Sequence, residues 1–511
     1  MNAPILKISE KDNLLVALKT LQPGDIIEYA GEPIEVKSEV RAKHKLAMRD
    51  FKVGEILYLY GVPVGVALVD IAKGESITVN NVKHAAQEIG EKGEASWEKP
   101  EVAAFQERTF KGYVRSDGQV GTANNWLIIP LVFCENRNVR VMREAFLKEL
   151  GYECGNKYEG LVSDLVEMYK DGKSTEELEA YTTEYKAKGY KSKLFDNIDG
   201  LRFLTHEMGC GGTDEDSQVL CRLLASYINH PNVAGATVLS LGCQKAQIGL
   251  LRQKLEEINP KFDKPLFCLE QQRYGTEEEL LETAIKNTFL GMVEANQLQR
   301  SDVPVSKLVI GVECGGSDGF SGISANPCIG KTADMLVALG GSVILSEFPE
   351  LVGVEQEIVD RCVNEDIAQR FIGLMKSYQS AAEASGSSMD MNPSPGNIKD
   401  GLITDAMKSA GAAKKGGTST IVGVHDYPGV ITPQDSGLHL LNTPGNDVES
   451  TTGLAGAGAN LILFSTGLGT PTGNPVTPVI KVSSNSLLAR KMPDIIDYDT
   501  GKIISGEQSL E

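Results

Sequence analysis

Three cysteines follow short apolar runs at the point where each run gives way to glycine. Cys210 ends LRFLTHEMGC, Cys243 ends ATVLSLGC and Cys314 ends KLVIGVEC. Such β-branched and apolar runs predict buried parallel strands, and ligands of open α/β sheets bind outside the carboxyl ends of the strands. Thiolate and imidazole are good ligands for transition metals. We therefore predict a metal site built from Cys210, Cys243, Cys314 and His206, although three unrelated core thiols are the plainer alternative.

The segment ECGGSDGFSGISANP (313–327) adds acid–base groups to the third of these cysteines. Glu313 and Asp318 are candidate catalytic acids or bases, as is His206. Ser317 and Asn326 can hydrogen-bond substrate hydroxyls, and the glycines let the backbone approach a ligand closely. This density of polar groups in one turn indicates a functional site.

Two further glycine-rich segments offer substrate-binding groups. In GYVRSDGQVGTANN (112–125), Arg115 can bind a carboxylate in a bidentate manner, with Asp117 and Asn124 beside it. The alternative is a turn whose Asp and Asn serve only the backbone.

A pair of strand exits near the C-terminus contributes the remaining candidates. Asn446 and Asp447 follow one strand and precede a helix that Asn446 would cap, and Thr466 begins the glycine turn TGLGTPTG. The turn lacks the Lys-Ser/Thr ending of a phosphate-binding loop, so we expect it to hold a carboxylate.

The composition limits the classes of protein to consider. The chain has 511 residues and a net charge of −19, from 69 acidic and 50 basic residues. This charge predicts neither a nucleic-acid nor a membrane partner. No secretory signal or spanning segment is evident, and nine cysteines without a regular framework indicate a reducing compartment, so we expect a cytoplasmic protein.

The elements that must position these residues predict an α/β multidomain protein. Residues 1–85 contain three spaced glycine turns between short β-prone pieces, which indicates a small all-β module. Residues 86–107 are polar and predict a linker. Residues 108–330 form a central α/β domain with a helical insert at 137–190, and residues 331–511 form a second α/β domain. We expect mainly parallel sheets in both.

Together these segments resemble the altronate/galactarate dehydratase family, with NPSPGN (392–397), TPGNDVES and FSTGLGTPTG in the family's order. The first module resembles the family's SAF (β-clip) domain, and the long insert is similar to the altronate-type members. The resemblance implies a hydro-lyase that converts a D-altronate-like hexonate to a 2-keto-3-deoxy sugar acid. It also implies that His44, in the SAF-like module, reaches the pocket as an acid or base.

The resemblance implies a divalent metal, Fe²⁺ in the first place, with Mn²⁺ or an iron–sulfur cluster as alternatives. It also favours a homo-oligomer with a small sugar acid as its partner. The sequence departs from the family's pattern where Gln119, Ala123 and Leu468 stand in place of arginines, and Ala406 and Met407 in place of glutamates. Asp214 occupies an often basic position. A galactarate or other sugar-acid dehydratase, a binding paralogue without activity, and a closed structural metal site therefore remain as alternatives.

Overall fold

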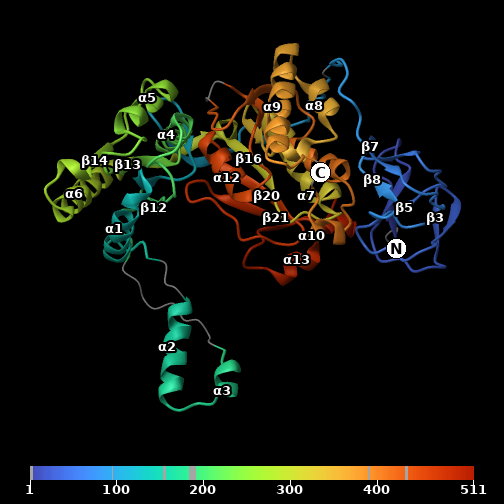
Figure 1. Cartoon of the computed structure of the whole chain (residues 1–511), viewed down its shortest axis with the longest axis horizontal. Coiled ribbons are helices and arrows are strands. Elements are labelled where there is room, and N and C mark those ends of the chain that lie inside the picture. Colours follow the sequence, from blue (N-terminus) through green and yellow to red (C-terminus); the bar gives the residue numbers. More distant parts are fainter. Residues whose placement is uncertain are drawn as a thin grey trace.

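The computed structural model describes residues 4–94, 96–153, 157–182, 192–389, 392–431 and 435–510. A small β module, a seven-stranded C-terminal domain and a four-stranded central domain lie side by side in that order across the molecule (Figure 1). The prediction of an all-β module followed by two α/β domains is confirmed.

The N-terminal module consists of three small antiparallel sheets. Their strands are β1 (Ile5–Leu6), β2 (Leu14–Ala17) and β5 (Lys45–Ala47); β3 (Ile26–Tyr29) and β4 (Glu32–Glu35); and β6 (Ile56–Leu59), β7 (Val62–Ala67) and β8 (Val82–Lys83). The predicted glycine turns at Gly24, Gly54 and Gly74 all have φ between 84° and 90°. Only glycine adopts this conformation without steric cost, which explains their regular recurrence.

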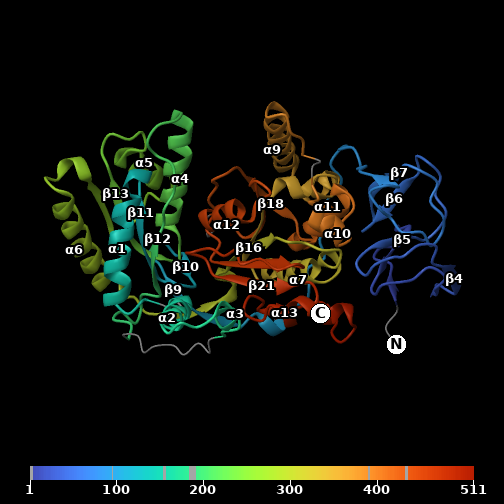
Figure 2. The ribbon, with the colours of Figure 1, turned by 60° about the horizontal axis from the view of Figure 1, so that its bottom comes forward.

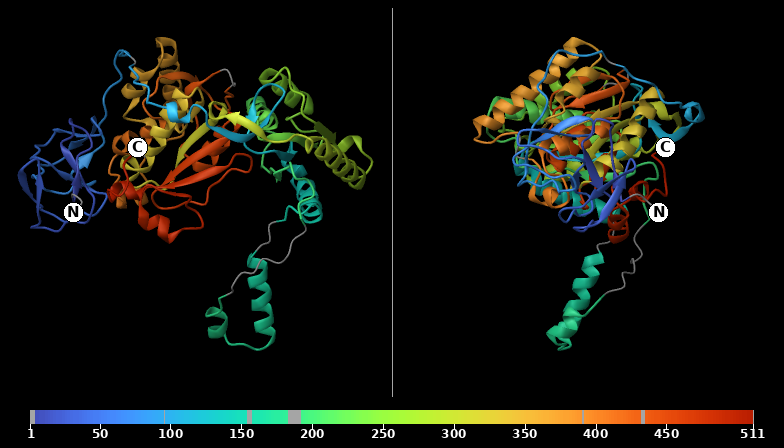
Figure 3. Two further views of the ribbon diagram at one scale, coloured as in Figure 1. Left: turned by 180° about the vertical axis from the view of Figure 1, so that it is seen from behind. Right: turned by 90° about the vertical axis from the view of Figure 1, so that its right-hand side faces the viewer.

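The predicted linker has little regular structure apart from the 3₁₀ turn η1 (Ala103–Phe105), but it is anchored. The amides of Gly90 and Gly93 donate to side chains of α8 (Glu355–Arg361), namely to Gln356 at 2.7 Å and Asp360 at 2.8 Å. The chain thus crosses the face of the C-terminal domain before it enters the central one (Figure 3).

The central domain is a parallel sheet with two layers of helices. Its strand order is β12 (Gly200–Phe203), β11 (Asn125–Pro130), β13 (Val233–Ser240) and β14 (Leu266–Glu270). Leu127 and Ile129 of β11 pack with α4 (Asp214–Asn229) and α5 (Ile248–Ile258), whereas Trp126 and Ile128 pack with α1 (Asn136–Glu149) and α6 (Glu277–Ala295). Successive side chains of β11 point to opposite faces of the sheet, and helices cover both faces (Figure 2).

The helical insert is smaller than predicted. Helix α1 belongs to the body of the central domain, and only α2 (Lys157–Lys170) and α3 (Thr175–Glu179) project from it (Figures 1 and 3). Residues 183–190 of the predicted insert lie outside the described residues. A small antiparallel sheet of β9 (Thr109–Val114), β10 (Val120–Gly121) and β15 (Ser301–Pro304) pairs the start of the domain with its end.

The C-terminal domain contains a seven-stranded parallel sheet. Its order is β18 (Ile421–His425), β19 (Gly437–Leu441), β17 (Ser342–Leu345), β16 (Val309–Cys314), β20 (Leu461–Thr466), β21 (Val479–Ser483) and β22 (Tyr498–Asp499). The helices around it are α7 (Ala325–Ala338), α8, α9 (Glu365–Ala384), α10 (Pro395–Lys399), α11 (Asp405–Ala412), α12 (Asp447–Gly456), α13 (Ser486–Lys491) and α14 (Gly501–Ile504).

The predicted boundary at residue 330 is wrong. Strand β16 pairs with β17 and β20, so it lies in the middle of the C-terminal sheet and not in the central domain. This places Cys314 in a different domain from Cys210 and Cys243. Among the described residues, no helix is both long and apolar enough to cross a lipid bilayer.

Candidate active site

A cavity of about 720 Å³ opens above the carboxyl ends of strands β16 and β17. Its wall includes Cys314, at the end of β16, and Glu347 and Glu350, which follow β17. Asp447, at the start of α12, completes a group of acidic residues on the same wall. The site therefore occupies the position expected for a ligand in a parallel α/β sheet.

Glu347 is held in an unusual backbone conformation at the centre of this group. It has φ of 63° and ψ of 67°, in the left-handed region that costs a residue with a side chain about 1 kcal/mol or more. Its amide donates to Thr443 Oγ1 at 2.9 Å, and its side chain is almost fully buried. Residues in such conformations cluster at functional sites.

Cys314 and Glu350 share the buried Lys415, and Glu350 also pairs with Lys408. The Cys314 thiol donates to Glu350 Oε2 at 3.0 Å and accepts from Lys415 Nζ at 2.8 Å. Lys408 Nζ lies 2.9 Å from Glu350 Oε1. Burial, and then the Glu350 charge, raises the pKa of Cys314 to about 12. Burial alone would raise the pKa of Glu350, but Lys408 and Lys415 lower it to about 2. At neutral pH the site thus holds a thiol and a carboxylate.

Glu313 and Glu347 form a second pair of carboxyl groups. Among the described residues Lys415 is the one lysine within 4 Å of either group, which is too little positive charge to keep both groups ionised. Glu313 Oε2 accepts from Ser346 Oγ at 3.1 Å and from Ser450 Oγ, but buried Oε1 has no hydrogen-bond donor among the described residues. Burial, and then the charges of Glu313 and Glu350, raises the pKa of Glu347 well above its ordinary range. These neighbours therefore favour the protonated form of Glu347.

Two overlapping sets of side chains can hold a metal ion. Ligand atoms of Cys314, Glu347 and Glu350 lie within 4.8 Å of one another, and so do those of Glu313, Glu347 and Asp447. Carboxylates suit Mn²⁺ and Mg²⁺, and a thiolate adds preference for iron or zinc. Because Glu313 Oε1 is buried without a donor, a divalent cation bound here would supply its missing partner. The residues present therefore fit such an ion.

Four of the predicted site residues take part in this constellation. Glu313 belongs to the carboxyl pair, and Cys314, Ser317 and Asp447 line the cavity. Asn446 has the predicted capping role, since its Oδ1 accepts from the Val448 amide at 3.1 Å.

Asp318, predicted as catalytic, instead joins the N-terminal module to the C-terminal domain. Its buried carboxylate lies 2.9 Å from Lys43 Nζ and accepts hydrogen bonds from Ser321 and Ser484. His44, next to Lys43, hydrogen-bonds through Nε2 to the carbonyl of Lys399 at 3.0 Å. Neither residue is among those that line the cavity.

Asn326 and Thr466, predicted to bind substrate, stabilise the protein instead. Both are buried. Asn326 donates to the Gly411 carbonyl and accepts from Ser465, and Thr466 Oγ1 accepts from the Gly469 amide.

The Arg115 segment also has a structural role. Arg115 is buried, and burial lowers its pKa to about 10. Its guanidinium donates to the Pro231 carbonyl and to Asn124 Oδ1, both at 2.8 Å. Asp117 accepts from the amide of Gln119 and from Asn259. The alternative interpretation, a turn that serves its own backbone, describes this segment.

The predicted metal site of Cys210, Cys243, Cys314 and His206 is not formed. Cys210 and Cys243 lie in exposed loops of the central domain, whereas Cys314 is buried in the other sheet. His206 Nε2 hydrogen-bonds to the Pro130 carbonyl at 2.7 Å, and its Nδ1 accepts from the Met208 amide. Both nitrogens are thus engaged by the backbone.

Local sequence patterns do not single out Glu347, Glu350, Lys408 and Lys415 as site residues. One signal was available, because Glu347 ends the segment SVILSE just as Glu313 and Cys314 end KLVIGVEC. The lysines come from α11 and the 3₁₀ turn η7 (Ala413–Gly416), where no local pattern distinguishes them from surface lysines.

Comparison with known proteins agrees with this arrangement along the chain. Three family models match: "Altronate/galactarate dehydratase SAF domain" at residues 3–85, "D-galactarate dehydratase/Altronate hydrolase, second domain" at 112–296, and "D-galactarate/Altronate dehydratase, C-terminal" at 305–511. The altronate dehydratase of Bacillus subtilis is 33% identical over 97% of this chain and 90% of its own. The altronate dehydratase of Escherichia coli is 32% identical over 98% of this chain and 91% of its own length.

The chain belongs to the altronate/galactarate dehydratase family. It is accordingly a carbon–oxygen lyase. The galactarate dehydratase (L-threo-forming) of Escherichia coli is 34% identical, over 55% of this chain and 54% of its own.

The positions at which this family member departs from the usual pattern fall into two groups. Leu468 lines the cavity and is 36% exposed, so an arginine is missing from the wall itself. Ala406 and Met407 are fully buried in α11, and Gln119 hydrogen-bonds to Asp117. Ala123 donates its amide to Asn232 at 3.3 Å. Asp214 pairs with Lys245 on the surface.

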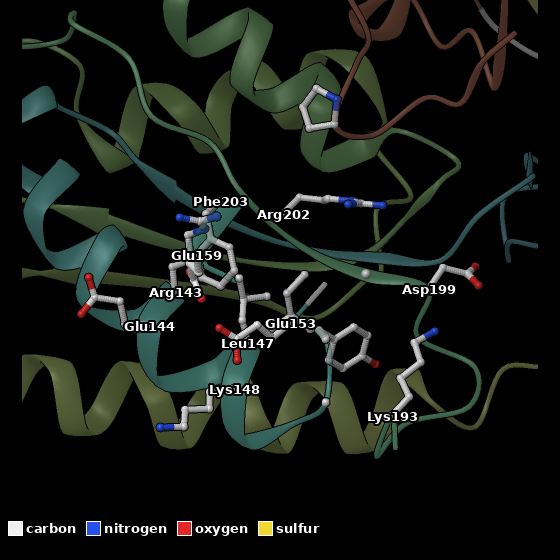
Figure 4. A pocket seen from close by; sticks show the side chains of 15 residues that line it. Arg143, Glu144, Leu147, Lys148, Glu153, Glu159, Lys193, Asp199, Arg202 and Phe203 are labelled. Carbon is white, nitrogen blue, oxygen red and sulfur yellow. The ribbon is translucent and has the colours of Figure 1, made fainter. Parts of the chain in front are cut away.

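A second cavity of this dehydratase, of about 830 Å³, lies beside α1 and β12 (Figure 4). Charges of both signs line it, including Arg143, Lys148, Glu144 and Glu153. No cysteine or histidine is present among its described lining residues, and no metal-binding group of acidic side chains is found there. We therefore assign the chemistry to the cavity at Glu347.

Proposed function

We propose that the protein dehydrates a D-altronate-like hexonate to a 2-keto-3-deoxy sugar acid at the cavity beside Glu347. The observation that carries the proposal is the buried Glu347 on the cavity wall, whose carboxyl group lies close to those of Glu313 and Glu350. The relatives named altronate dehydratase match almost the whole chain, whereas the one named galactarate dehydratase matches about half of it.

The reaction must remove a weakly acidic proton from C2 and expel a poor leaving group from C3. Asp447 is the base in this proposal, because it lines the cavity and burial raises its pKa. Its carboxylate accepts the C2 proton, and the electrons of that bond form the C2–C3 double bond as the C3–O bond breaks. A base with a raised pKa is better matched to this task at neutral pH.

Glu347 is the acid. It protonates the departing hydroxyl, which leaves as water, and the enol then becomes the 2-keto acid. The neighbouring carboxylates favour the protonated form of Glu347 before the reaction, and its loss of a proton is offset by Lys415, whose Nζ lies 3.5 Å from Glu347 Oε2. Asp447 and Glu347 can thus act as base and acid in one reaction, because their surroundings set the pKa of each carboxyl group.

Lys408 binds the substrate carboxylate. An ammonium group has three donors, and two of them are used by Glu350 and by Asn392 Oδ1, at 2.9 Å and 3.0 Å. The third has no acceptor among the described residues, and Lys408 lines the cavity. Serine side chains at the end of α9 and beyond, those of Ser385, Ser387 and Ser388, line the same cavity and suit sugar hydroxyls.

A divalent cation, with Fe²⁺ first and Mn²⁺ second, would be held by Cys314 and Glu350, the two members of one possible ligand set that are neither the proposed acid nor the proposed base. When bound, it supplies Lewis-acid stabilisation of the negative charge that develops on the substrate carboxylate. This ligand set replaces the one predicted from sequence.

The test is an assay of a panel of hexonates and hexarates with Fe²⁺ under reducing conditions, with 2-keto-3-deoxy product as the readout. We expect turnover of D-altronate above that of galactarate. Preferred turnover of a hexarate would support the galactarate alternative.

The binding-paralogue alternative has one observation in its favour, the leucine at 468 in the cavity wall. Binding of D-altronate by calorimetry without release of a keto acid would establish it and overturn the proposed activity.

A further inference from the structure

Three free cysteines lie in neighbouring loops at one edge of the central sheet. Cys134 follows β11, Cys210 follows β12 and Cys243 follows β13. These strands are parallel and adjacent, in the order β12-β11-β13, so their carboxyl ends face the same side (Figure 2). All three cysteines are exposed.

Backbone hydrogen bonds join the three loops directly. The Phe133 amide donates to the Met208 carbonyl at 3.0 Å, which links the first loop to the second. The amide of Lys245 donates to the Cys210 carbonyl at 3.0 Å, which links the second loop to the third. The cysteines are therefore immediate neighbours of residues that hold the loops together.

Polar side chains hold the backbone of these loops in place. His206 uses both ring nitrogens on the backbone of the first two loops, at Pro130 and Met208. Buried Gln244 accepts from the Gly242 amide at 2.7 Å and donates to the Ala246 carbonyl at 3.0 Å, which shapes the turn around Cys243. A rigid frame that ends in exposed thiols is typical of a preformed ligand site.

A glycine allows the loops to approach one another. Gly209 has φ of 95°, and a Cβ atom there would lie 2.3 Å from the Leu131 carbonyl oxygen. The residue before Cys210 must thus be glycine for the second loop to lie against the first.

The three thiols lie on loops that contact one another through the Met208 and Cys210 carbonyls. The three sulfur atoms are nevertheless not all within 4.8 Å of one another. A single tetrahedral zinc ion, with Zn–S distances of about 2.3 Å, requires sulfurs about 3.8 Å apart. The wider arrangement favours a polynuclear centre, in which separate iron atoms bind separate thiolates.

We propose that Cys134, Cys210 and Cys243 hold a four-iron iron–sulfur cluster through three thiolates. The fourth iron has no cysteine ligand among the described loops, because the other described cysteines of this domain lie in α4 and β14. This centre is separate from the cavity at Glu347 and does not depend on the proposed function.

The test is anaerobic reconstitution of the full chain with ferrous iron, ferric iron and sulfide, followed by measurement of iron, acid-labile sulfide and visible absorption. We expect about four iron and four sulfide per chain. Cys134→Ser, Cys210→Ser and Cys243→Ser should each retain less than about a tenth of the sulfide. Because these side chains are exposed, the variants should keep the far-ultraviolet circular dichroism of the parent.

Two matched variants separate this centre from other thiols. Cys268→Ser, on β14 of the same sheet, and Cys314→Ser, in the other domain, should retain the full sulfide content. The proposal is overturned if the unaltered protein binds no sulfide, if it binds only zinc, or if Cys134→Ser retains the cluster.

Discussion

The side-chain nitrogen of Lys415 donates to the Cys314 thiol at 2.8 Å, although 101 positions separate the two residues. Burial would lower the pKa of Lys415, but Cys314, Glu350 and Glu347 together raise it well above its ordinary value. Lys415 is therefore charged, almost fully buried and the common partner of the acidic groups in the cavity.

Lys415→Met should reduce the free energy of unfolding by about 3–5 kcal/mol, because it leaves buried carboxylates without their cation. Urea denaturation at pH 7 measures this. The control is Lys414→Met, since Lys414 pairs with Glu357 at 3.1 Å on a partly exposed surface and should cost about 1 kcal/mol or less. Equal losses in the two variants would contradict the role given to Lys415.

Glu347→Gln should lower kcat by roughly 10²–10⁴-fold, because an amide cannot give up a proton to the leaving hydroxyl. The fold should be retained, since glutamine resembles the protonated carboxyl group in shape. Steady-state kinetics with the best substrate of the panel checks this. Glu355→Gln, at a carboxyl on α8 whose pKa is also raised by burial, should leave kcat within about twofold.

Stability should also depend on pH through Glu347. The folded protein keeps the proton at pH values where the unfolded chain, with an ordinary pKa of 4.5, has lost it. The contribution of Glu347 to the free energy of unfolding is therefore complete below about pH 4.5. It is lost as the pH rises toward the raised pKa of Glu347 in the folded protein, by up to about 1.4 kcal/mol per pH unit.

Urea denaturation of metal-free protein at pH 5 and pH 8 tests this dependence. Glu347→Gln should gain stability relative to the parent protein as the pH increases. A stability difference that does not change with pH would show that the carboxyl is ionised in the folded state.

Lys43→Met should weaken the contact between the N-terminal module and the C-terminal domain by about 3 kcal/mol, because Asp318 is fully buried and loses its only cation within 4 Å among the described residues. Limited proteolysis in the linker and thermal unfolding would detect this. Lys52→Met is the control, since Lys52 and Asp70 form an exposed pair within the module. Similar rates of linker cleavage in the two variants would contradict this prediction.

The sequence predicts where the strands lie along the chain better than it predicts which strands pair in each sheet. An apolar run followed by glycine marks the end of a buried strand, and this is confirmed for β13 and β16. The same pattern does not say which sheet a strand joins, since parallel strands of both domains have similar composition. For that reason Cys314 was grouped with Cys210 and Cys243, and the boundary was placed after β16.

Cys134 was overlooked because it follows WLIIPLVF without a glycine beside it. Buried charge networks were equally hard to foresee. Arg115, Asp318 and Lys415 have similar local surroundings in the sequence, yet the first binds the backbone, the second joins two domains and the third neutralises a cavity. Only tertiary contacts distinguish these roles.

The backbone conformation of Glu347 is one that glycine would adopt more easily. Glycine adopts φ of 63° without steric cost, so Glu347→Gly would remove both the local strain and the repulsion among carboxyl groups. We expect such a variant to melt at a higher temperature than the parent while it fails to turn over any sugar acid. At this position the protein retains a residue that makes it less robust than its fold would allow.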